Sequence, residues 1–325
     1  MRVSVIGAGA IGGWLTAGFL KAGAEARVLA RGASLEALRS GGLCLDDGTE
    51  QHCFPVHATT DPSDLKGADI LLLGLKAHDL PAMAPAIQAA LGPETIVVPA
   101  INGLPWWFFE NFGGPAKGQR IEAVDPDGVL SRALPAERVV GCVVHAASHV
   151  TAPAHIRLVK ADRVWLGDAA GSGQYAQKVA DALRAGDVPA EVSDHIHREV
   201  WNKLWGNSCM NPLTALSRAG MSDFLADDGA RGLAISMMRE MSSLGDQIGL
   251  EGFDDPEGRI AVTRKLGAFR TSMLQDVEAG RPIELDPILG GLVELGRHLG
   301  QATPVMEGVY GLARMLDTNL RAEKG

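Results

Sequence analysis

The sequence predicts a two-part α/β protein, in which a parallel-sheet domain is followed by an all-helical domain. In the N-terminal part, short apolar runs such as RVSVI at 2–6 alternate with helical stretches, which is the order that builds a parallel sheet. These runs are continuously apolar, as in strands that are buried on both faces. From residue 195 onward the pattern is helical throughout. We therefore predict domains at residues 1–193 and 194–325.

The individual elements follow from the spacing of apolar and turn residues. Strands are predicted at 2–6, 25–30, 69–74, 95–100 and 139–144, with a hairpin formed by 155–159 and 162–166 around Lys160-Ala161. Helices are predicted at 11–22, 173–185, 195–215, 227–249, 257–279, 287–300 and 304–320. Asp286 and Pro287 are typical of an N-cap and a first helical residue. Pro212 is expected to break or kink its helix.

Composition excludes several classes of protein. The chain has 325 residues with 39 acidic against 30 basic side chains, so no basic face is expected for nucleic acid or an anionic membrane. No apolar run approaches the ~20 residues of a membrane helix, and the N-terminus lacks a signal-peptide pattern. The four cysteines are far apart, which favours free, mostly buried thiols in a reducing compartment. We therefore expect a cytoplasmic protein.

A glycine-rich loop follows the first predicted strand. Gly7-Ala8-Gly9-Ala10-Ile11-Gly12 is a G-x-G-x-x-G sequence that opens the first helix, which is the context the motif requires. Gly7 permits the tight turn, Gly9 lets backbone approach a pyrophosphate, and Gly12 lets helix and strand pack closely. The N–H groups of Ala10, Ile11 and the helix start favour phosphate. The pattern predicts a Rossmann-type dinucleotide site; the alternative is a tight turn without a ligand.

Arg31 follows the second predicted strand, where the choice between the two nicotinamide dinucleotides is made. A free ribose 2′-hydroxyl is typically bound by an acidic residue there, and a 2′-phosphate by a cation. Here the strand ends in Leu29-Ala30-Arg31, and the first acid after it is Glu36. The position favours NADP(H) over NAD(H), unless Arg31 is only a solvated surface side chain.

Three polar residues recur at a spacing of four in the helical domain. Lys203, Asn207 and Asn211 share one face of the helix predicted at 195–215, in an otherwise largely apolar segment. A buried lysine is costly unless an anion meets it. The stripe therefore favours a ligand site over a solvated face, and the alternative is a structural hydrogen-bonded stripe between helices.

Taken together, these residues resemble the ketopantoate reductase family over nearly the whole chain. The matching features are GAGAIGG at 7–13, Arg31, LKAHD with Lys76, NG at 102–103, HAA at 145–147, the Lys203/Asn207/Asn211 stripe, SMLQD at 272–276 and IELD at 283–286. The resemblance implies a Rossmann-type domain and a helical domain like that of 6-phosphogluconate dehydrogenase. It also implies NADPH-dependent reduction of 2-dehydropantoate to pantoate, in pantothenate biosynthesis, with substrate between the domains.

The resemblance also implies roles for individual residues. Lys203 matches the proton donor to the carbonyl oxygen, and Glu284 matches a carboxylate that holds a substrate hydroxyl and orients the lysine. The implied substrate contacts are Asn102, Asn207, Asn211 and Ser272. The implied cofactor contacts are Gly7, Gly9, Ala10, Ile11, Gly12, Arg31, Lys76, Asn102 and Glu284. No metal is needed, and His195-Ile196-His197 has no second ligand pair nearby.

Two departures from the family pattern put the substrate in doubt. Phe269 stands where typical members have a substrate-binding asparagine, three residues before Ser272, which implies a more apolar pocket. An aromatic run, 104–109, either walls the pocket or forms hydrophobic core.

The alternatives are therefore a related reductase of another branched or aromatic 2-oxoacid, and a non-catalytic NADPH-binding sensor. The expected partner is a small 2-oxoacid. The helical domain leaves a homodimer open, although no sustained heptad pattern predicts one.

Overall fold

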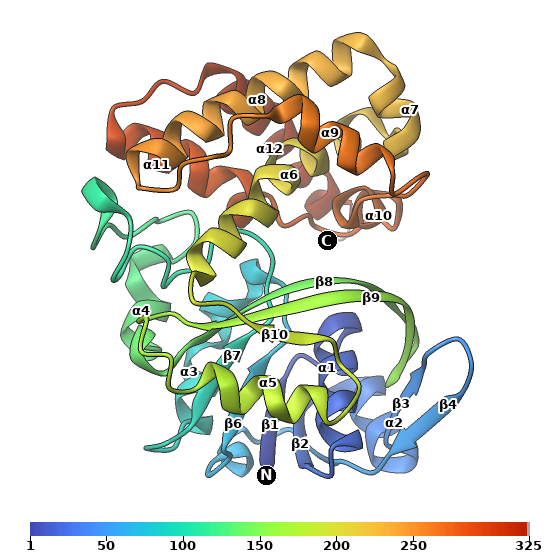
Figure 1. Cartoon of the computed structure of the whole chain (residues 1–325). Helices are drawn as coiled ribbons and strands as arrows, with labels where there is room; N and C mark the ends of the chain where they lie inside the picture. Colours follow the sequence, from blue (N-terminus) through green and yellow to red (C-terminus); the bar gives the residue numbers. More distant parts are fainter. Residues whose placement is uncertain (324–325) are drawn as a thin grey trace. The chain divides into compact units, whose positions relative to one another are not determined.

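The computed structural model describes residues 1–323, which divide into two compact units (Figure 1). The first unit contains residues 1–101 and 128–199, and the second contains residues 102–127 together with the chain from residue 200 onward. The sequence predicted a single division after residue 193, and nothing in it indicated that residues 102–127 belong with the helices. This segment is rich in large apolar side chains, and they are buried in the second unit.

The first unit is built on a five-stranded parallel sheet with the order β5-β2-β1-β6-β7. The strands are β1 (Arg2–Ile6), β2 (Glu25–Leu29), β5 (His57–Thr59), β6 (Ile70–Leu73) and β7 (Ile96–Pro99). Four of the five predicted strands are thus confirmed to within a residue or two. The strand order reverses between β1 and β6, and ligands of open α/β sheets bind at the carboxyl ends of the strands at such a point.

Helix α1 (Ala10–Lys21) lies between this sheet and a second one. It contacts β1, β2 and β6 on one side, and β3 (Leu43–Asp46), β8 (Val140–Ala152) and β9 (His155–Asp168) on the other. Every residue from Gly12 to Phe19 is consequently buried. Figure 1 shows α1 beside the long β8–β9 hairpin. A helix that is apolar on all sides is typical of such a fully enclosed position.

The second sheet differs from the prediction. Its path is β10-β9-β3-β4, with β8 paired to β9; β4 is Gln51–Phe54 and β10 is Ala190–Val192. The hairpin expected around Lys160-Ala161 is wrong, because both predicted strands belong to β9. The reversal comes earlier, next to Ala154, which has φ 63°. The strand predicted at 139–144 is the first half of β8.

The cysteine prediction is half right. Cys44 and Cys53 form a disulfide, since they lie directly opposite each other in the antiparallel β3–β4 pair, with their Cα atoms 4.0 Å apart. Their separation of nine residues in sequence gave no sign of this pairing. Cys142 and Cys209 are free and buried as expected, and burial raises the pKa of the Cys209 thiol to about 12.

Short helices cover the rest of the first unit. They are α2 (Gly32–Gly41), η1 (Pro62–Leu65), η2 (Ala77–Asp79), α3 (Leu80–Ala90), η4 (Pro126–Gly128), α4 (Val129–Ala133), η5 (Ala136–Arg138) and α5 (Ala176–Arg184). Helix α5 packs on β9, β10 and α1.

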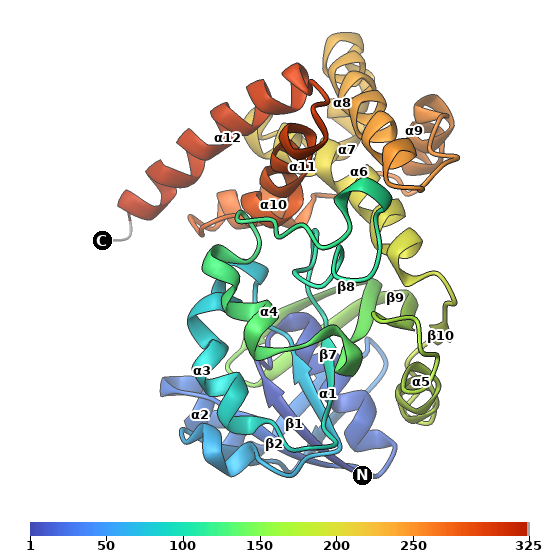
Figure 2. The same ribbon diagram turned by 90° about the vertical axis from the view of Figure 1, so that its left-hand side faces the viewer.

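The second unit is a bundle of helices. They are α6 (Ile196–Ser217, of which residues from 200 belong here), η3 (Gly114–Ala116), α7 (Met221–Ala226), α8 (Asp228–Gln247), α9 (Pro256–Arg264), α10 (Ser272–Glu278), η6 (Asp286–Gly290), α11 (Gly291–Leu299) and α12 (Pro304–Ala322). Helices α8, α11 and α12 contact one another (Figure 2). No helix within residues 1–323 is long and apolar enough to span a membrane.

Three details of the predicted helices are wrong. Pro212 does not break helix α6, which continues to Ser217, because the flanking residues are buried and packing outweighs the missing hydrogen bond; the kink expected there stays a prediction. The helix predicted at 257–279 is two helices, α9 and α10, separated by a loop that holds Phe269. Asp286 begins a π-helical turn instead of capping it, and its Oδ1 accepts a hydrogen bond from the Tyr310 hydroxyl at 2.7 Å.

The aromatic run forms core of the second unit. Trp107, Phe108 and Phe109 are each no more than 2% exposed. The Phe108 ring lies 6.1 Å from the ring of Trp201 and 4.9 Å from that of Phe109, measured between centroids. Of the two interpretations that the sequence left open, the structure therefore supports hydrophobic core. Because Trp201 is on α6, the run also ties residues 102–112 to the helix that carries Lys203.

Candidate active site

The glycine-rich turn is held by close backbone contacts. Gly7 has φ 95°, a conformation that favours glycine. A Cβ on Gly12 would lie 2.1 Å from the Gly7 carbonyl oxygen, and a Cβ on Gly74 would lie 2.5 Å from the Gly12 Cα. The end of β6, the turn after β1 and the start of α1 therefore touch backbone to backbone.

Gly9 differs from its neighbours, because a Cβ there would meet only the Gly74 carbonyl oxygen, at 3.9 Å. It is the N-cap of α1, and no side chain caps the helix. No acidic residue occurs in the first turn, which begins with Ala10 and Ile11. Uncapped N–H groups beside open space suit the pyrophosphate of a dinucleotide.

Two cationic residues lie at the same edge of the sheet. Arg31 is two residues past the end of β2 and exposed, and its guanidinium has no carboxylate partner among residues 1–323. Lys76 is three residues past the end of β6, as the N-cap of η2. Both follow strands that flank β1, so the first unit gathers the glycine loop, Arg31 and Lys76 at the carboxyl ends of its strands.

Lys203 of the second unit makes a short contact with Asn102. The Lys203 ammonium donates a hydrogen bond to Asn102 Oδ1 at 2.6 Å, although the two residues are 101 positions apart. Lys203 is half-buried on α6. The contact therefore holds a positively charged donor in a fixed position.

The loop that carries Asn102 is fixed by its neighbour. Gly103 has φ 89°, and a Cβ there would lie 2.4 Å from the carbonyl oxygen of Pro287. The same carbonyl accepts a hydrogen bond from the Leu104 N–H at 2.7 Å. The Asn102 loop is therefore bound to the segment that holds Glu284, whose side chain is 5% exposed.

The side chains predicted to bind substrate lie close along α6 and α10. Asn207 and Asn211 follow Lys203 at one-turn intervals on α6, and Ser272 is the first residue of α10. The hydroxyls of Thr214 and Thr271 are 2.8 Å apart, which joins the last turns of α6 to the start of α10.

None of the side chains of Asn207, Asn211 and Ser272 has a hydrogen-bond partner within the described part of the chain. Asn211 is only 5% exposed, and because buried polar groups are normally paired, its amide is available to hydrogen-bond a ligand.

Sequence reasoning missed Arg259 of α9. Its guanidinium packs against Gly206 on α6, one turn after Lys203. Nothing in the local sequence PEGRIAVTR distinguishes Arg259 from an ordinary helix-surface arginine. The one sequence feature that could have pointed to Arg259 is Gly206, because glycine inside a helix is destabilising by about 1 kcal/mol relative to alanine and so needs a reason.

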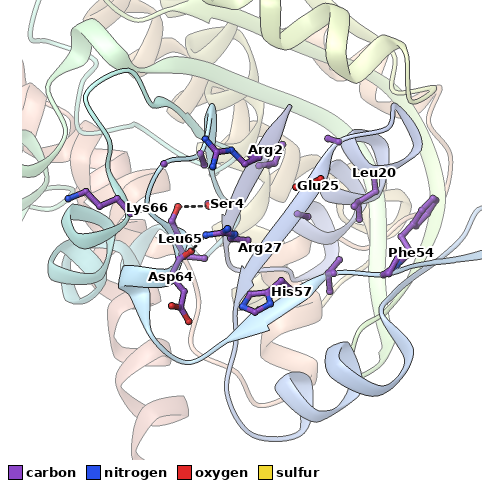
Figure 3. A pocket seen from close by; sticks show the side chains of 17 residues that line it. Arg2, Ser4, Leu20, Glu25, Arg27, Phe54, His57, Asp64, Leu65 and Lys66 are labelled. Atoms are coloured by element: carbon purple, nitrogen blue, oxygen red, sulfur yellow. Dashed lines mark hydrogen bonds between the residues drawn. The ribbon is translucent and has the colours of Figure 1, made fainter.

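A pocket of about 710 Å³ lies away from all of these residues. It opens at the amino ends of β1 and β2, where Arg2 and Glu25 begin the strands, and η1 forms one wall (Figure 3). Arg27 donates a hydrogen bond to the Asp64 carbonyl oxygen at 2.6 Å within it. The lining carries both signs of charge, and the pocket lies at the sheet edge opposite to the glycine loop. Residues 1–323 contain no group of three or more His, Cys, Asp or Glu side chains that could hold a metal ion.

The parallel sheet, with a glycine-rich turn where its strand order reverses, defines a Rossmann-type domain joined to a helical unit. Residues 3–171 match the family described as ketopantoate reductase PanE/ApbA, and residues 195–317 match the C-terminal domain of the same family. The chain belongs to the ketopantoate reductase family.

Relatives and solved structures agree with this family. A 2-dehydropantoate 2-reductase of Mesorhizobium japonicum is 39% identical over 320 residues, which cover 97% of this chain and 98% of the relative. A structure from Ralstonia solanacearum MolK2, assigned as a ketopantoate reductase, has a TM-score of 0.93 at 40% identity, with 98% of each chain covered. The 2-dehydropantoate 2-reductase of Methylococcus capsulatus has a TM-score of 0.84 at 26% identity, again with 98% of each chain covered.

Proposed function

We propose that this protein reduces the ketone of a 2-oxoacid to the 2-hydroxy acid, with 2-dehydropantoate as substrate and pantoate as product. The observation that carries the proposal is the Lys203 ammonium, held by Asn102 at 2.6 Å among unpaired amides. The family supports the substrate, because a curated relative that is 39% identical over 320 residues is a 2-dehydropantoate 2-reductase.

Lys203 supplies the proton in this proposal. Addition of hydride to a ketone carbon develops negative charge on the carbonyl oxygen, and a fixed cationic donor stabilises that charge and protonates it. Asn102 holds the ammonium, so little reorganisation is needed when the charge appears. Asn207, Asn211 and Ser272 offer hydrogen bonds to the rest of the substrate, and the buried Glu284 carboxylate receives a substrate hydroxyl. Solvent reprotonates the lysine after turnover.

The cofactor of the proposal is NADP(H), which supplies the hydride when bound. The start of α1 at Gly9 suits its pyrophosphate, and the exposed, unpaired Arg31 suits the 2′-phosphate. Lys76 lies at the same sheet edge and offers a second cation. An assay with NADH in place of NADPH, under otherwise identical conditions, should give a lower kcat/KM than NADPH does. Equal kcat/KM values for the two cofactors would contradict the role of Arg31.

Substitution of the lysine tests the proton donor. Lys203→Ala should lower kcat at least ~100-fold, the low end for the loss of a general acid. The assay is NADPH oxidation with 2-dehydropantoate, with circular dichroism as the folding control. Near-wild-type turnover in a folded variant would overturn the assigned role.

Phe269 favours a second candidate, reduction of another branched or aromatic 2-oxoacid. It is half-buried in the loop before Ser272, where the family pattern has a polar contact, so the pocket would accept apolar groups. A panel of 2-oxoacids separates the two candidates. A wide preference for 2-dehydropantoate excludes the second. Tight NADPH binding without turnover of any 2-oxoacid would instead favour a non-catalytic sensor.

A further inference from the structure

Arg259 is a partly buried cation without an anionic partner. Its Nε–H is buried and donates no hydrogen bond. No carboxylate within residues 1–323 lies at ion-pair distance from its guanidinium. The nearby acids are committed elsewhere: Glu257 pairs with Arg239, and Asp255 caps α9. Burial lowers the pKa of the guanidinium from its ordinary value, but arginine stays charged in proteins. A buried charge of this kind requires a counterion.

Helix α6 is shaped to receive this guanidinium. A Cβ on Gly206 would lie 2.9 Å from Arg259 Nη2 and 3.3 Å from its Nε, so the guanidinium would have to shift if this residue carried a side chain. Lys203 is three residues before Gly206, and side chains at that spacing are neighbours about 5–6 Å apart at Cβ. The guanidinium therefore lies beside the turn of α6 that follows Lys203.

We propose that Arg259, seated on Gly206, is a binding site for the carboxylate of the substrate. The inference rests on the proposed reduction of a 2-oxoacid, in which a carboxylate is bonded directly to the ketone that Lys203 protonates. A guanidinium binds a carboxylate through two parallel hydrogen bonds and supplies the charge that Asn207, Asn211 and Ser272 lack. The site selects 2-oxoacids against ketones whose acid group is missing or esterified.

The test compares a charged and an uncharged substrate. In Arg259→Met, KM for the 2-oxoacid should rise about 10- to 100-fold, as expected for loss of a hydrogen bond between charged groups. KM for the methyl ester of the same acid should stay within about 2-fold, since the ester carries no carboxylate. Arg259→Lys should restore part of the affinity for the acid. Arg264→Met is the matched control, because Arg264 is on the same helix and donates to the Leu225 carbonyl oxygen.

A second variant, Gly206→Ala, keeps the charge of Arg259 but displaces its guanidinium. The added methyl group takes up space beside the guanidinium, so this variant should also raise KM for the acid and leave KM for the ester unchanged. Equal losses for acid and ester in both variants, with NADPH affinity intact, would show that Arg259 is only a packing residue. If wild type reduces no 2-oxoacid, the proposed function fails; calorimetric binding of the 2-hydroxy acid to wild type and Arg259→Met still tests the carboxylate site. Absence of any difference between them would overturn it.

Discussion

At the scale of single residues, two glycines of one loop are required for different reasons. Gly12 is where the α1 backbone touches the Gly7 carbonyl, so its missing side chain is a packing requirement. Gly9 has φ −77° and ψ −157°, which any residue can adopt, and open space in front of it. Its missing side chain therefore matters only to a ligand. The motif alone assigned these roles, and the contacts explain them.

Alanine at each position should separate the two reasons. Gly12→Ala should destabilise the protein by at least 1–3 kcal/mol, as overpacking does, and lower the melting temperature. Gly9→Ala should melt like wild type but bind NADPH at least ~10-fold more weakly, because the methyl group occupies the phosphate position. Thermal melts and fluorescence titration with NADPH measure both. A large loss of stability in Gly9→Ala would contradict the distinction.

At the scale of elements, the β3–β4 hairpin shows how register decides chemistry. Cys44 and Cys53 are nine residues apart in sequence, and their residue type and spacing alone favoured free thiols. The antiparallel register places them opposite each other, Cys44 against Cys53, and the disulfide follows. A turn at 47–50, held by the Asp47 carboxylate, sets that register; hydrogen bonds from Thr49 and Glu50 lower the pKa of the Asp47 carboxyl below its ordinary value.

Removal of the bridge should weaken the first unit. Cys53→Ser opens a loop of about ten residues, for which chain entropy gives a loss of about 2–3 kcal/mol in the free energy of unfolding. Urea unfolding under non-reducing conditions measures it. Cys142→Ser, at a buried thiol outside the disulfide, is the control: it keeps the Cys44–Cys53 bridge and should lose stability in dithiothreitol as wild type does, whereas Cys53→Ser should not respond. Identical stability of wild type with and without dithiothreitol would show that the bridge contributes nothing.

At the scale of the whole molecule, the chain leaves its first unit at residue 101 and returns at 128. The excursion brings Asn102 to Lys203, and it brings the ring of Phe108, which stacks with Trp107, to Trp201. The second unit is therefore incomplete without 102–127, and the catalytic pair that we propose depends on both stretches.

Fragments should reveal this division. A fragment of residues 1–193 keeps the aromatic run but lacks the helices that bury it, so it should bind the dye ANS and aggregate. A matched fragment in which a Gly/Ser linker replaces 102–127 should bind less dye and melt cooperatively, because its remaining core is self-contained. Cooperative melting of 1–193 without dye binding would contradict the division.

Local spacing and motifs were enough to predict four of the five strands of the parallel sheet, the glycine loop, the polar stripe on α6 and the family. They were not enough to predict the Lys203–Asn102 bond or the position of Arg259, which join residues distant along the chain, or the disulfide, which depends on the register of β3 and β4. The continuity of α6 through Pro212 and the break between α9 and α10 also needed the structure. There, burial against neighbouring helices outweighs the local preference of the backbone, and only the folded chain contains those neighbours.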